Sequence, residues 1–361
     1  MIDEFYMKQA IQLARRGRGK VHPNPYVGAV IVKHDQILSQ GYHACFGGPH
    51  AEIDAISKLS PGELKNATLY VNLEPCTHHG KTPPCTDAIL RSGIRKVVIG
   101  MADPNPMVHE KGIRKLMQSG IEVKTSILEK DCLELNEVYI KSLKKKRPFV
   151  TLKIAQTLDG KIATSSGVSR WITSPDSRKR VHKMRNESDA VLIGINTVIQ
   201  DNPELTVRLG RGRQIKKIVL DSRLRIPDKA RILTNDAPES TILVTTSNAS
   251  PERIKALQEK GVEIWVLKAD PQGQVNLKSL WEKCFKQGIY SILVEGGKEI
   301  FTSVLKSGEA DRIVLFTAPK LFGEGIASLG NLGVSDPNSA LTFPQFRWQK
   351  CGTDMVFDGR L

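Results

Sequence analysis

The sequence lacks any long apolar run: no stretch approaches the roughly eighteen residues that a membrane-spanning helix needs. Its start, MIDEFYMKQAIQLARRG, carries acids where a secretory signal carries bases. Cysteine is also scarce, and the 6 cysteines in 361 residues are irregularly spaced, which does not suit a disulfide framework. We therefore expect a cytoplasmic protein with no membrane partner, whose cysteines are metal ligands, core residues or bystanders.

Aromatic residues make up only 6% of the chain, and no stripe of basic and aromatic side chains marks a single-stranded nucleic-acid surface. The net charge of +15 does not come from a basic tail. Residues 1–146 hold 21 Lys and Arg against 15 Asp and Glu, and residues 147–361 hold 32 against 23. Such a spread-out positive field attracts polyanions but also suits phosphorylated small molecules, so charge alone does not choose between them.

A chain of this length is expected to form two domains. The basic stretch KSLKKKRP at 141–148 ends in proline, and we place the boundary there, between a domain 1–146 and a domain 147–361. In the first domain, helical spacing over 2–16 lets one face hold Phe5, Tyr6, Ala10, Leu13 and Ala14. An α/β/α sandwich is predicted from strands expected at 27–32, 69–72, 96–99 and 121–125 and helices at 50–59, 86–92 and 111–119.

The second half alternates in the same way and predicts another α/β domain. Strands are expected at 149–155, 190–194, 217–221, 241–246, 262–267, 291–295 and 312–318, and helices at 251–260, 277–287 and 298–307. LVEGGKEIF at 293–301 reads as a strand, a glycine turn and a helix start, which could hold an anion or be a plain connection. GRGR at 210–213 indicates a loop or a loose phosphate contact. Because no G-x-G-x-x-G follows a first strand, a Rossmann dinucleotide site is not supported.

Four residues of the first half carry recognisable metal chemistry. His50, Cys76 and Cys85 supply three of the four tetrahedral positions of zinc, and an open fourth position marks a catalytic site rather than a structural one. Zinc lowers the pKa of a bound water towards neutrality. Glu52, two residues after His50, can face that water and move its proton to a ring nitrogen and then to the departing amine. The order H-x-E followed by proline–cysteine pairs is typical of zinc nucleobase deaminases.

The spacing departs from that motif, because eight residues separate Cys76 from Cys85 where the short motif has two. The alternative is a pair of buried core thiols and an unrelated surface histidine. Four elements in order, with each cysteine directly after a proline, favour the zinc site. His78 and His79 lie between the cysteines and could be ligands, but we favour a role for them, with Lys81, in lining the substrate pocket. A core or rim role is expected for Cys45.

The motifs resemble those of the bifunctional riboflavin-biosynthesis deaminase–reductase family, which uses the long cysteine spacing. The resemblance rests on HPNPYVGAVIV (22–32), GYH (41–43), HAE (50–52), LEPCTHHGKTPPC (73–85), ADPNP (102–106), LKIAQTLDGKIAT (152–164), SRWITS (169–174), INTVIQDNPELTVR (195–208), VLDS (219–222), LVEGG (293–297) and FTAPKLFG (316–323). It implies a cytidine-deaminase-like domain with one zinc ion, followed by a dihydrofolate-reductase-like domain that uses NADPH. The reactions implied are deamination of a diaminopyrimidinone ribosylamine phosphate and then reduction of its ribosyl group to ribityl.

The resemblance also implies roles for individual residues. Cofactor contacts are expected from Ala155, Trp171, Thr197, Asp201, Ser222 and the turn formed by Gly297, Lys298, Glu299, Ile300, Phe301, Thr302 and Ser303. Substrate contacts in the reductase half are expected from Ser169, Arg185, Leu205, Arg208 and Glu295, with the two arginines gripping a phosphate. Those in the deaminase half are expected from Asn24, His43, His78, Lys81, Asp103 and Asn105. Taken singly, Trp171 could be a core residue and Arg185 a solvated helix residue.

Several points stay open at this stage. Lys153 is a candidate general acid for the reduction, or a structural ion-pair partner. A homodimer or homotetramer is plausible, and the positive charge favours NADPH over NADH. The rival hypotheses are a nucleic-acid base deaminase with an accessory phosphate-binding domain, which the spread-out charge disfavours, and an inactive scaffold, which the complete ligand set disfavours. We expect a phosphorylated pyrimidine as substrate and no nucleic-acid partner.

Overall fold

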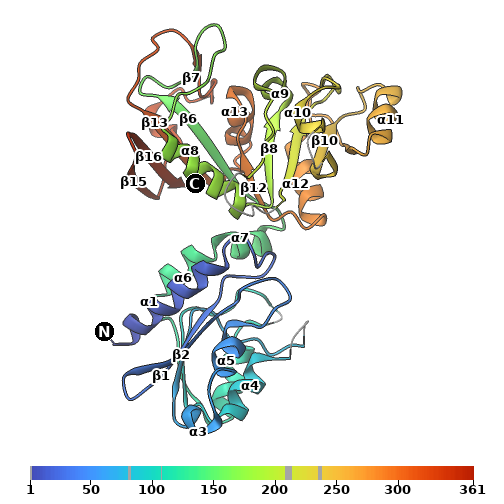
Figure 1. Cartoon of the computed structure of the whole chain (residues 1–361). Coiled ribbons are helices and arrows are strands. Elements are labelled where there is room, and N and C mark those ends of the chain that lie inside the picture. The colour runs from blue at the N-terminus through green and yellow to red at the C-terminus, as the bar shows by residue number, and fades with distance from the viewer. Residues whose placement is uncertain (1, 80–82, 107, 208–213, 235–237) are drawn as a thin grey trace. The chain divides into compact units, whose positions relative to one another are not determined.

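The computed structural model describes residues 2–79, 83–106, 108–207, 214–234 and 238–361 (Figure 1). Lys81, Arg208 and the GRGR stretch at 210–213 therefore lie outside the described residues. The chain divides into two compact units, Met1–Lys146 and Arg147–Leu361. The six cysteines form no disulfide. None of the helices described is both long and apolar enough to span a bilayer.

Unit 1 is built on a five-stranded sheet of order β2-β1-β3-β4-β5. β2 and β3 flank β1 antiparallel, whereas β3, β4 and β5 run parallel. The strands are β1 (Gly28–Lys33), β2 (Gln36–Tyr42), β3 (Thr68–Val71), β4 (Lys96–Ile99) and β5 (Glu122–Lys124). The helices are α1 (Ile2–Ala14), α2 (Ala51–Ile56), α3 (Pro61–Leu64), α4 (Cys85–Ser92), α5 (Lys111–Gln118), α6 (Glu129–Leu135) and α7 (Glu137–Lys145), with a 3-10 turn η1 (Arg15–Gly17).

Strand alternation separates two cores on the faces of this sheet. Val30 and Val32 point to the face that α1 and α6 cover, and Ala29 and Ile31 point to the face that α2, α4 and α5 cover. The predicted α/β/α sandwich is therefore confirmed (Figure 1). One detail was wrong: Phe5 is 54% exposed, because Tyr6, Met7, Ala10, Ile11, Leu13 and Ala14 make the buried face of α1.

Unit 2 contains a nine-stranded sheet of order β11-β10-β9-β8-β12-β6-β13-β16-β15. The strands from β11 to β13 run parallel, and β16 and β15 are added antiparallel at one edge. They span β6 (Phe149–Thr157), β8 (Ala190–Gly194), β9 (Lys216–Leu220), β10 (Thr241–Thr245), β11 (Glu263–Val266), β12 (Ser291–Val294), β13 (Arg312–Ala318), β15 (Gln345–Cys351) and β16 (Asp354–Arg360). A separate ribbon pairs β7 (Lys161–Ala163) with β14 (Ile326–Ala327).

Helices cover both faces of the larger sheet, so the α/β fold predicted for this half is confirmed. One face holds α12 (Leu277–Lys286) and α13 (Lys298–Lys306). The other holds α8 (Pro175–Glu187), α9 (Ile195–Asp201), α10 (Arg231–Thr234) and α11 (Pro251–Glu259). Short 3-10 turns lie at η2 (Pro238–Ser240) and η3 (Pro337–Ser339). The late strand β12 lies between β8 and β6, so the direction of strand addition reverses there, as it does where α/β sheets bind ligands.

The elements that the sequence did not predict have weak or mixed periodicity. They include β2, whose residues alternate between exposed and buried only in part, and the hairpin of β15 and β16 at the sheet edge. Helix α8 was missed because its sequence PDSRKRVHKMRNE is mostly polar, with only Ser177 and Val181 buried. In these places tertiary packing rather than local pattern decides the structure.

Candidate active sites

Three ligand atoms meet at the ends of two helices in unit 1. His50 is the N-cap residue of α2, Cys85 is the first residue of α4, and Cys76 lies in the loop after β3. His50 Nδ1 lies 3.2 Å from Cys85 Sγ and 3.6 Å from Cys76 Sγ, and the three ligand atoms lie within 4.8 Å of one another. Two sulfurs and one imidazole nitrogen are ligands that zinc prefers, so this group fits the metal that the sequence predicts.

The protonation of the two thiols also suits a cation. The pKa of Cys76 is lowered, first by its hydrogen bond with Cys85 and then by that with His50. The pKa of Cys85 is raised, because the same sulfur pair shares a proton and because the site is buried. One thiolate is therefore favoured even before a metal neutralises it.

Glu52 lies in the first turn of α2, beside the three ligands. Its side chain is only 3% exposed. Burial, followed by the nearby charge of Cys76, raises the pKa of Glu52 to about 7, and His50 opposes this shift. A carboxyl group with such a pKa exchanges protons near neutral pH, which is what a general acid–base group requires.

His43 lies against the ligand His50 and is hydrogen-bonded to Asn24. The rings of His43 and His50 are 5.4 Å apart in an edge-on arrangement. His43 Nδ1 donates to the carbonyl of Pro49 at 2.9 Å, which leaves Nε2 to accept from the Asn24 amide at 3.0 Å. Burial lowers the pKa of His43, so this ring is neutral at pH 7. The two predicted substrate contacts therefore belong to one hydrogen-bonded group beside the metal ligands.

Asp103 and Asn105 form a second group. The Asp103 carboxylate is 6% exposed, and its Oδ1 accepts from the backbone N–H of Asn105 at 2.9 Å and from the hydroxyl of Tyr139 at 3.1 Å. Burial raises the pKa of Asp103, and the charge of His78 is close enough to oppose this shift. His78 Nδ1 is buried with no hydrogen-bond partner among the described residues, so the imidazole has a polar atom left for a ligand.

Sequence reasoning missed two residues of this site, Glu74 and Tyr139. Glu74 is 3% exposed and accepts hydrogen bonds from four backbone N–H groups between residues 103 and 113. A charged residue directly after the strand-like run LYVNL was the one available indication of a buried carboxylate. Tyr139 had none, because it comes from α7, more than thirty residues along the chain from Asp103.

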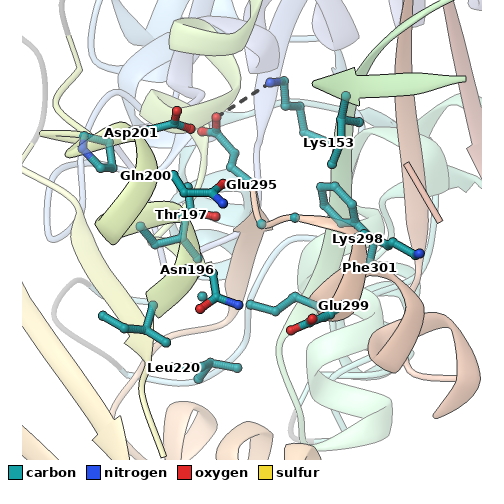
Figure 2. Close-up of a pocket in the computed structure, with 18 of the residues that line it drawn as sticks. Lys153, Asn196, Thr197, Gln200, Asp201, Leu220, Glu295, Lys298, Glu299 and Phe301 are labelled. Carbon is teal, nitrogen blue, oxygen red and sulfur yellow. Dashed lines mark ion pairs between the residues drawn. The ribbon is translucent and has the colours of Figure 1, made fainter. Parts of the chain in front are cut away.

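Unit 2 contains a cavity of about 1480 Å³ at the carboxyl ends of β6, β8, β9 and β12 (Figure 2). All but one of the predicted reductase residues within the described chain line it: Ala155, Ser169, Trp171, Arg185, Thr197, Asp201, Leu205, Ser222, Glu295, Gly297, Lys298, Glu299, Ile300, Phe301 and Ser303. Thr302 is the described exception, because its hydroxyl donates to the carbonyl of Lys298 and accepts from the N–H of Gly330. Arg208, also predicted for this site, lies outside the described residues.

A buried ion-pair group occupies one wall of this cavity. Arg185 Nη2 donates to Glu295 Oε2 at 2.9 Å, Nε pairs with Oε1, and Nη1 donates to the carbonyl of Thr206 at 3.3 Å. Lys153 Nζ lies 3.9 Å from Glu295 Oε2. The dashed line in Figure 2 marks this ion pair. The side chains of Lys153 and Arg185 are each 17% exposed and that of Glu295 7%. Arg185 is therefore not the solvated helix residue that was the alternative from the sequence, and its contact with a substrate phosphate stays a prediction.

The glycine turn after β12 is placed as expected for an anion site. Gly297 is the N-cap residue of α13, and Gly296, Gly297 and Lys298 line the cavity. A Cβ on Gly194, at the end of β8, would lie 2.7 Å from Ile300 Cδ1, so glycine permits the close packing of α13 there. Backbone N–H groups at the start of a nine-residue helix favour a phosphate.

The lining of the cavity also carries aromatic and polar groups. Trp171 is 65% exposed, and the guanidinium of Arg178 lies 4.5 Å from its ring centroid. The Ser169 hydroxyl donates to Asp201 Oδ1 at 3.1 Å. Ser222 donates to Gln274 Oε1 at 3.1 Å. Trp171 is thus not a core residue, and its open face suits a planar ring of a ligand.

Comparison with known families assigns the two halves separately. The cytidine and deoxycytidylate deaminase zinc-binding region matches residues 1–101, and the RibD C-terminal domain matches residues 148–357. The first match contains His50, Cys76 and Cys85, and the second contains the whole cavity wall described above. Fold and sites together define a bifunctional enzyme in which a zinc-dependent deaminase is joined to an NADPH-dependent reductase.

Relatives of nearly equal length narrow the class to one family. The riboflavin biosynthesis protein RibD of Aquifex aeolicus is 46% identical over 98% of this chain and 97% of its own, and that of Escherichia coli is 38% identical over 97% and 96%. The solved structure of the Thermotoga maritima deaminase/reductase is 39% identical with a TM-score of 0.84, and RibD of Acinetobacter baumannii 35% with 0.88. Each covers 99% of this chain and 98% of its own. The chain belongs to the RibD family and is a bifunctional deaminase and reductase of riboflavin biosynthesis. The predicted cytidine-deaminase-like and dihydrofolate-reductase-like folds are thereby confirmed.

Proposed function

We propose that this chain deaminates diaminohydroxyphosphoribosylaminopyrimidine in unit 1 and reduces 5-amino-6-(5-phosphoribosylamino)uracil in unit 2. These are the substrates in the name of the Thermotoga maritima relative. The single observation that carries the proposal is the meeting of His50, Cys76 and Cys85 beside the buried Glu52 in one unit. The large cavity with its buried ion-pair group in the other unit supports the second step.

In the deaminase step, His50, Cys76 and Cys85 would hold zinc. Bound zinc supplies activation of a water molecule for attack on the ring carbon. Glu52 takes a proton from that water and delivers it to a ring nitrogen, and then assists the departing amine as an acid. The Asn24–His43 group and the Asp103–Asn105 group, with His78, bind the pyrimidine and its phosphate and orient the amino-bearing carbon towards Glu52.

In the reductase step, the turn at Gly297–Ser303, with Ala155, Trp171, Thr197, Asp201 and Ser222, would hold NADPH, which supplies the hydride. Ser169 and Leu205 border the substrate. Glu295 fixes the Arg185 guanidinium and the Lys153 ammonium on the cavity wall. Burial lowers the pKa of Lys153, which favours it as the donor of a proton to the developing amine.

The experiment is a pair of assays on one purified protein: ammonia release from the diaminopyrimidine phosphate and NADPH oxidation with the uracil intermediate. Both activities are expected, together with one zinc per chain by metal analysis. Ammonia release from cytidine or adenosine in RNA, with none from the pyrimidine phosphate, would refute the substrate assignment. Equal rates with NADH and NADPH would refute the cofactor preference.

We also propose that the chain forms a homo-oligomer. The edge strand β15 is exposed along nearly its whole length and presents Phe346 and Trp348, 62% and 54% exposed. An exposed apolar edge strand is a common pairing surface. Sedimentation equilibrium should give a mass of at least two chains, and a single-chain mass at micromolar concentration would refute this. The cytoplasmic location expected from the sequence stays a prediction.

A further inference from the structure

The Glu74 carboxylate is a buried charge whose partners are all backbone amides of one segment. Oε2 accepts from the N–H groups of Asp103 and Glu110, each at 3.0 Å. Oε1 accepts from those of Gly112 at 2.8 Å and Ile113 at 3.3 Å. No basic side chain makes a hydrogen bond or ion pair with Glu74 among the interactions described. Four amide donors take the place of a cation, two of them in the first turn of α5, where the helix dipole favours a negative charge.

The same contact joins the metal-binding loop to the Asp103 segment. Glu74 N donates to the carbonyl of Met101 at 3.0 Å. A Cβ on Gly112 would lie 2.2 Å from the carbonyl oxygen of Pro75, so the start of α5 packs directly against the residue that precedes the ligand Cys76. The position of the Asp103 segment is therefore tied to the position of Cys76 through Glu74.

Tyr139 completes the arrangement from another element. Its hydroxyl donates to Asp103 Oδ1, the same oxygen that accepts from Asn105 N. Glu74 holds the backbone of Asp103 and Tyr139 holds its carboxylate. Neither side chain lies among the three metal ligands or carries the proton that the reaction moves.

We infer that Glu74, together with Tyr139, is a positioning residue that sets substrate affinity in the deaminase site by fixing Asp103 relative to the metal ligands. This rests on the proposed function, in which Asp103 contacts the pyrimidine substrate. Displacing a group that positions the substrate by about 1 Å can lower the rate of reaction about a hundredfold. A modest shift of this segment therefore has a measurable effect on the deaminase activity. Because Asp103 binds rather than reacts, the loss falls mainly on KM.

Glu74→Gln tests the inference in the intact chain. The amide keeps one acceptor oxygen and puts an NH₂ group where the second oxygen met two N–H donors. The deaminase KM is expected to rise about tenfold or more, with kcat changed less, zinc content unchanged and reductase activity unchanged. Glu63→Gln is the matched control, because Glu63 also accepts a backbone N–H, from Ser60 at 2.8 Å, but at the exposed start of α3. An unchanged KM in a zinc-loaded Glu74→Gln protein overturns the inference.

Tyr139→Phe keeps the test decisive if Glu74→Gln does not fold. It removes one hydroxyl, and we expect a severalfold rise in the deaminase KM, against no change in Tyr6→Phe, whose hydroxyl donates to the Asp35 carbonyl. In that case an unchanged KM in Tyr139→Phe overturns the inference. Asp103→Asn separates the proposed contact of Asp103 with the substrate from the positioning role of Glu74 and Tyr139. An unchanged KM there overturns both, whereas a raised KM there with unchanged values for Glu74→Gln and Tyr139→Phe overturns only the positioning role.

Discussion

The deaminase site takes its reactive groups from two short segments, residues 50–52 and 76–85, whereas the reductase cavity collects single side chains from the ends of four strands and the loops between them. In the deaminase site the reactive residues lie close together in the sequence, because metal ligands must converge on one point. In the reductase cavity, positions far apart in sequence become neighbours only through the parallel sheet. The two sites should therefore fail in different ways.

Zinc removal should separate the two sites most strongly. Dialysis of the protein against a zinc chelator is expected to abolish ammonia release, because the Cys76–Cys85 pair and His50 are left without the metal that activates water. NADPH oxidation should persist, since no described residue group of unit 2 gathers three metal ligands. Adding zinc back should restore the first activity. A parallel loss of both activities would contradict the assignment of the zinc site to the deaminase reaction alone.

Replacing Glu52 by Gln should have the next largest effect on the deaminase activity. The amide cannot carry a proton between water and the ring, and general acid–base groups contribute about 10²–10⁴-fold. The deaminase kcat should fall by that factor, with zinc content and reductase activity unchanged. Asp54→Asn, on the same helix, should keep the deaminase rate within a few fold. A Glu52→Gln enzyme with normal kcat would exclude Glu52 as the proton carrier.

Glu295→Gln should act through the stability of unit 2 as well as its activity. It leaves Arg185 and Lys153 as buried cations without a carboxylate, and breaking a buried pair costs about 3–5 kcal/mol. Thermal unfolding followed by loss of reductase activity should shift to lower temperature. Glu282→Gln, at an exposed position of α12 away from the cavity, should shift it little. Equal effects of the two variants would show that the buried group is unimportant.

Protonation of Asp358 should have the smallest effect, a loss of stability that is confined to acid. Burial by itself raises the pKa of Asp358, but Arg312, Arg360 and Arg347 outweigh burial and lower this pKa to about 2. The carboxylate therefore stabilises the fold above its ordinary pKa of 3.8, and this contribution is lost as the pH falls towards 2. In acid unfolding curves, the difference between the native protein and Asp358→Asn should shrink across that window. A difference independent of pH would contradict the role of ionisation.

Local pattern predicted what depends on local chemistry. Most of the strands, the two α/β folds and the clustering of His50, Cys76 and Cys85 beside Glu52 followed from spacing and residue type. The partner of Arg185 did not, because Glu295 lies 110 residues away and only the order of β8, β12 and β6 brings them together. Thr302 is not part of the cavity lining, because a helical turn places neighbours on different faces, and its cofactor contact stays a prediction.

The position of β12 has a consequence for the order in which the chain folds. Residues 291–294 supply a central strand between β8 and β6, so the sheet of unit 2 cannot close until more than four fifths of the protein has left the ribosome. Every strand of unit 1, by contrast, is complete by residue 124. During synthesis the deaminase unit can therefore fold while the reductase unit still lacks its central strand. Chains that stop before β12 should be targets for proteolysis in their second half alone.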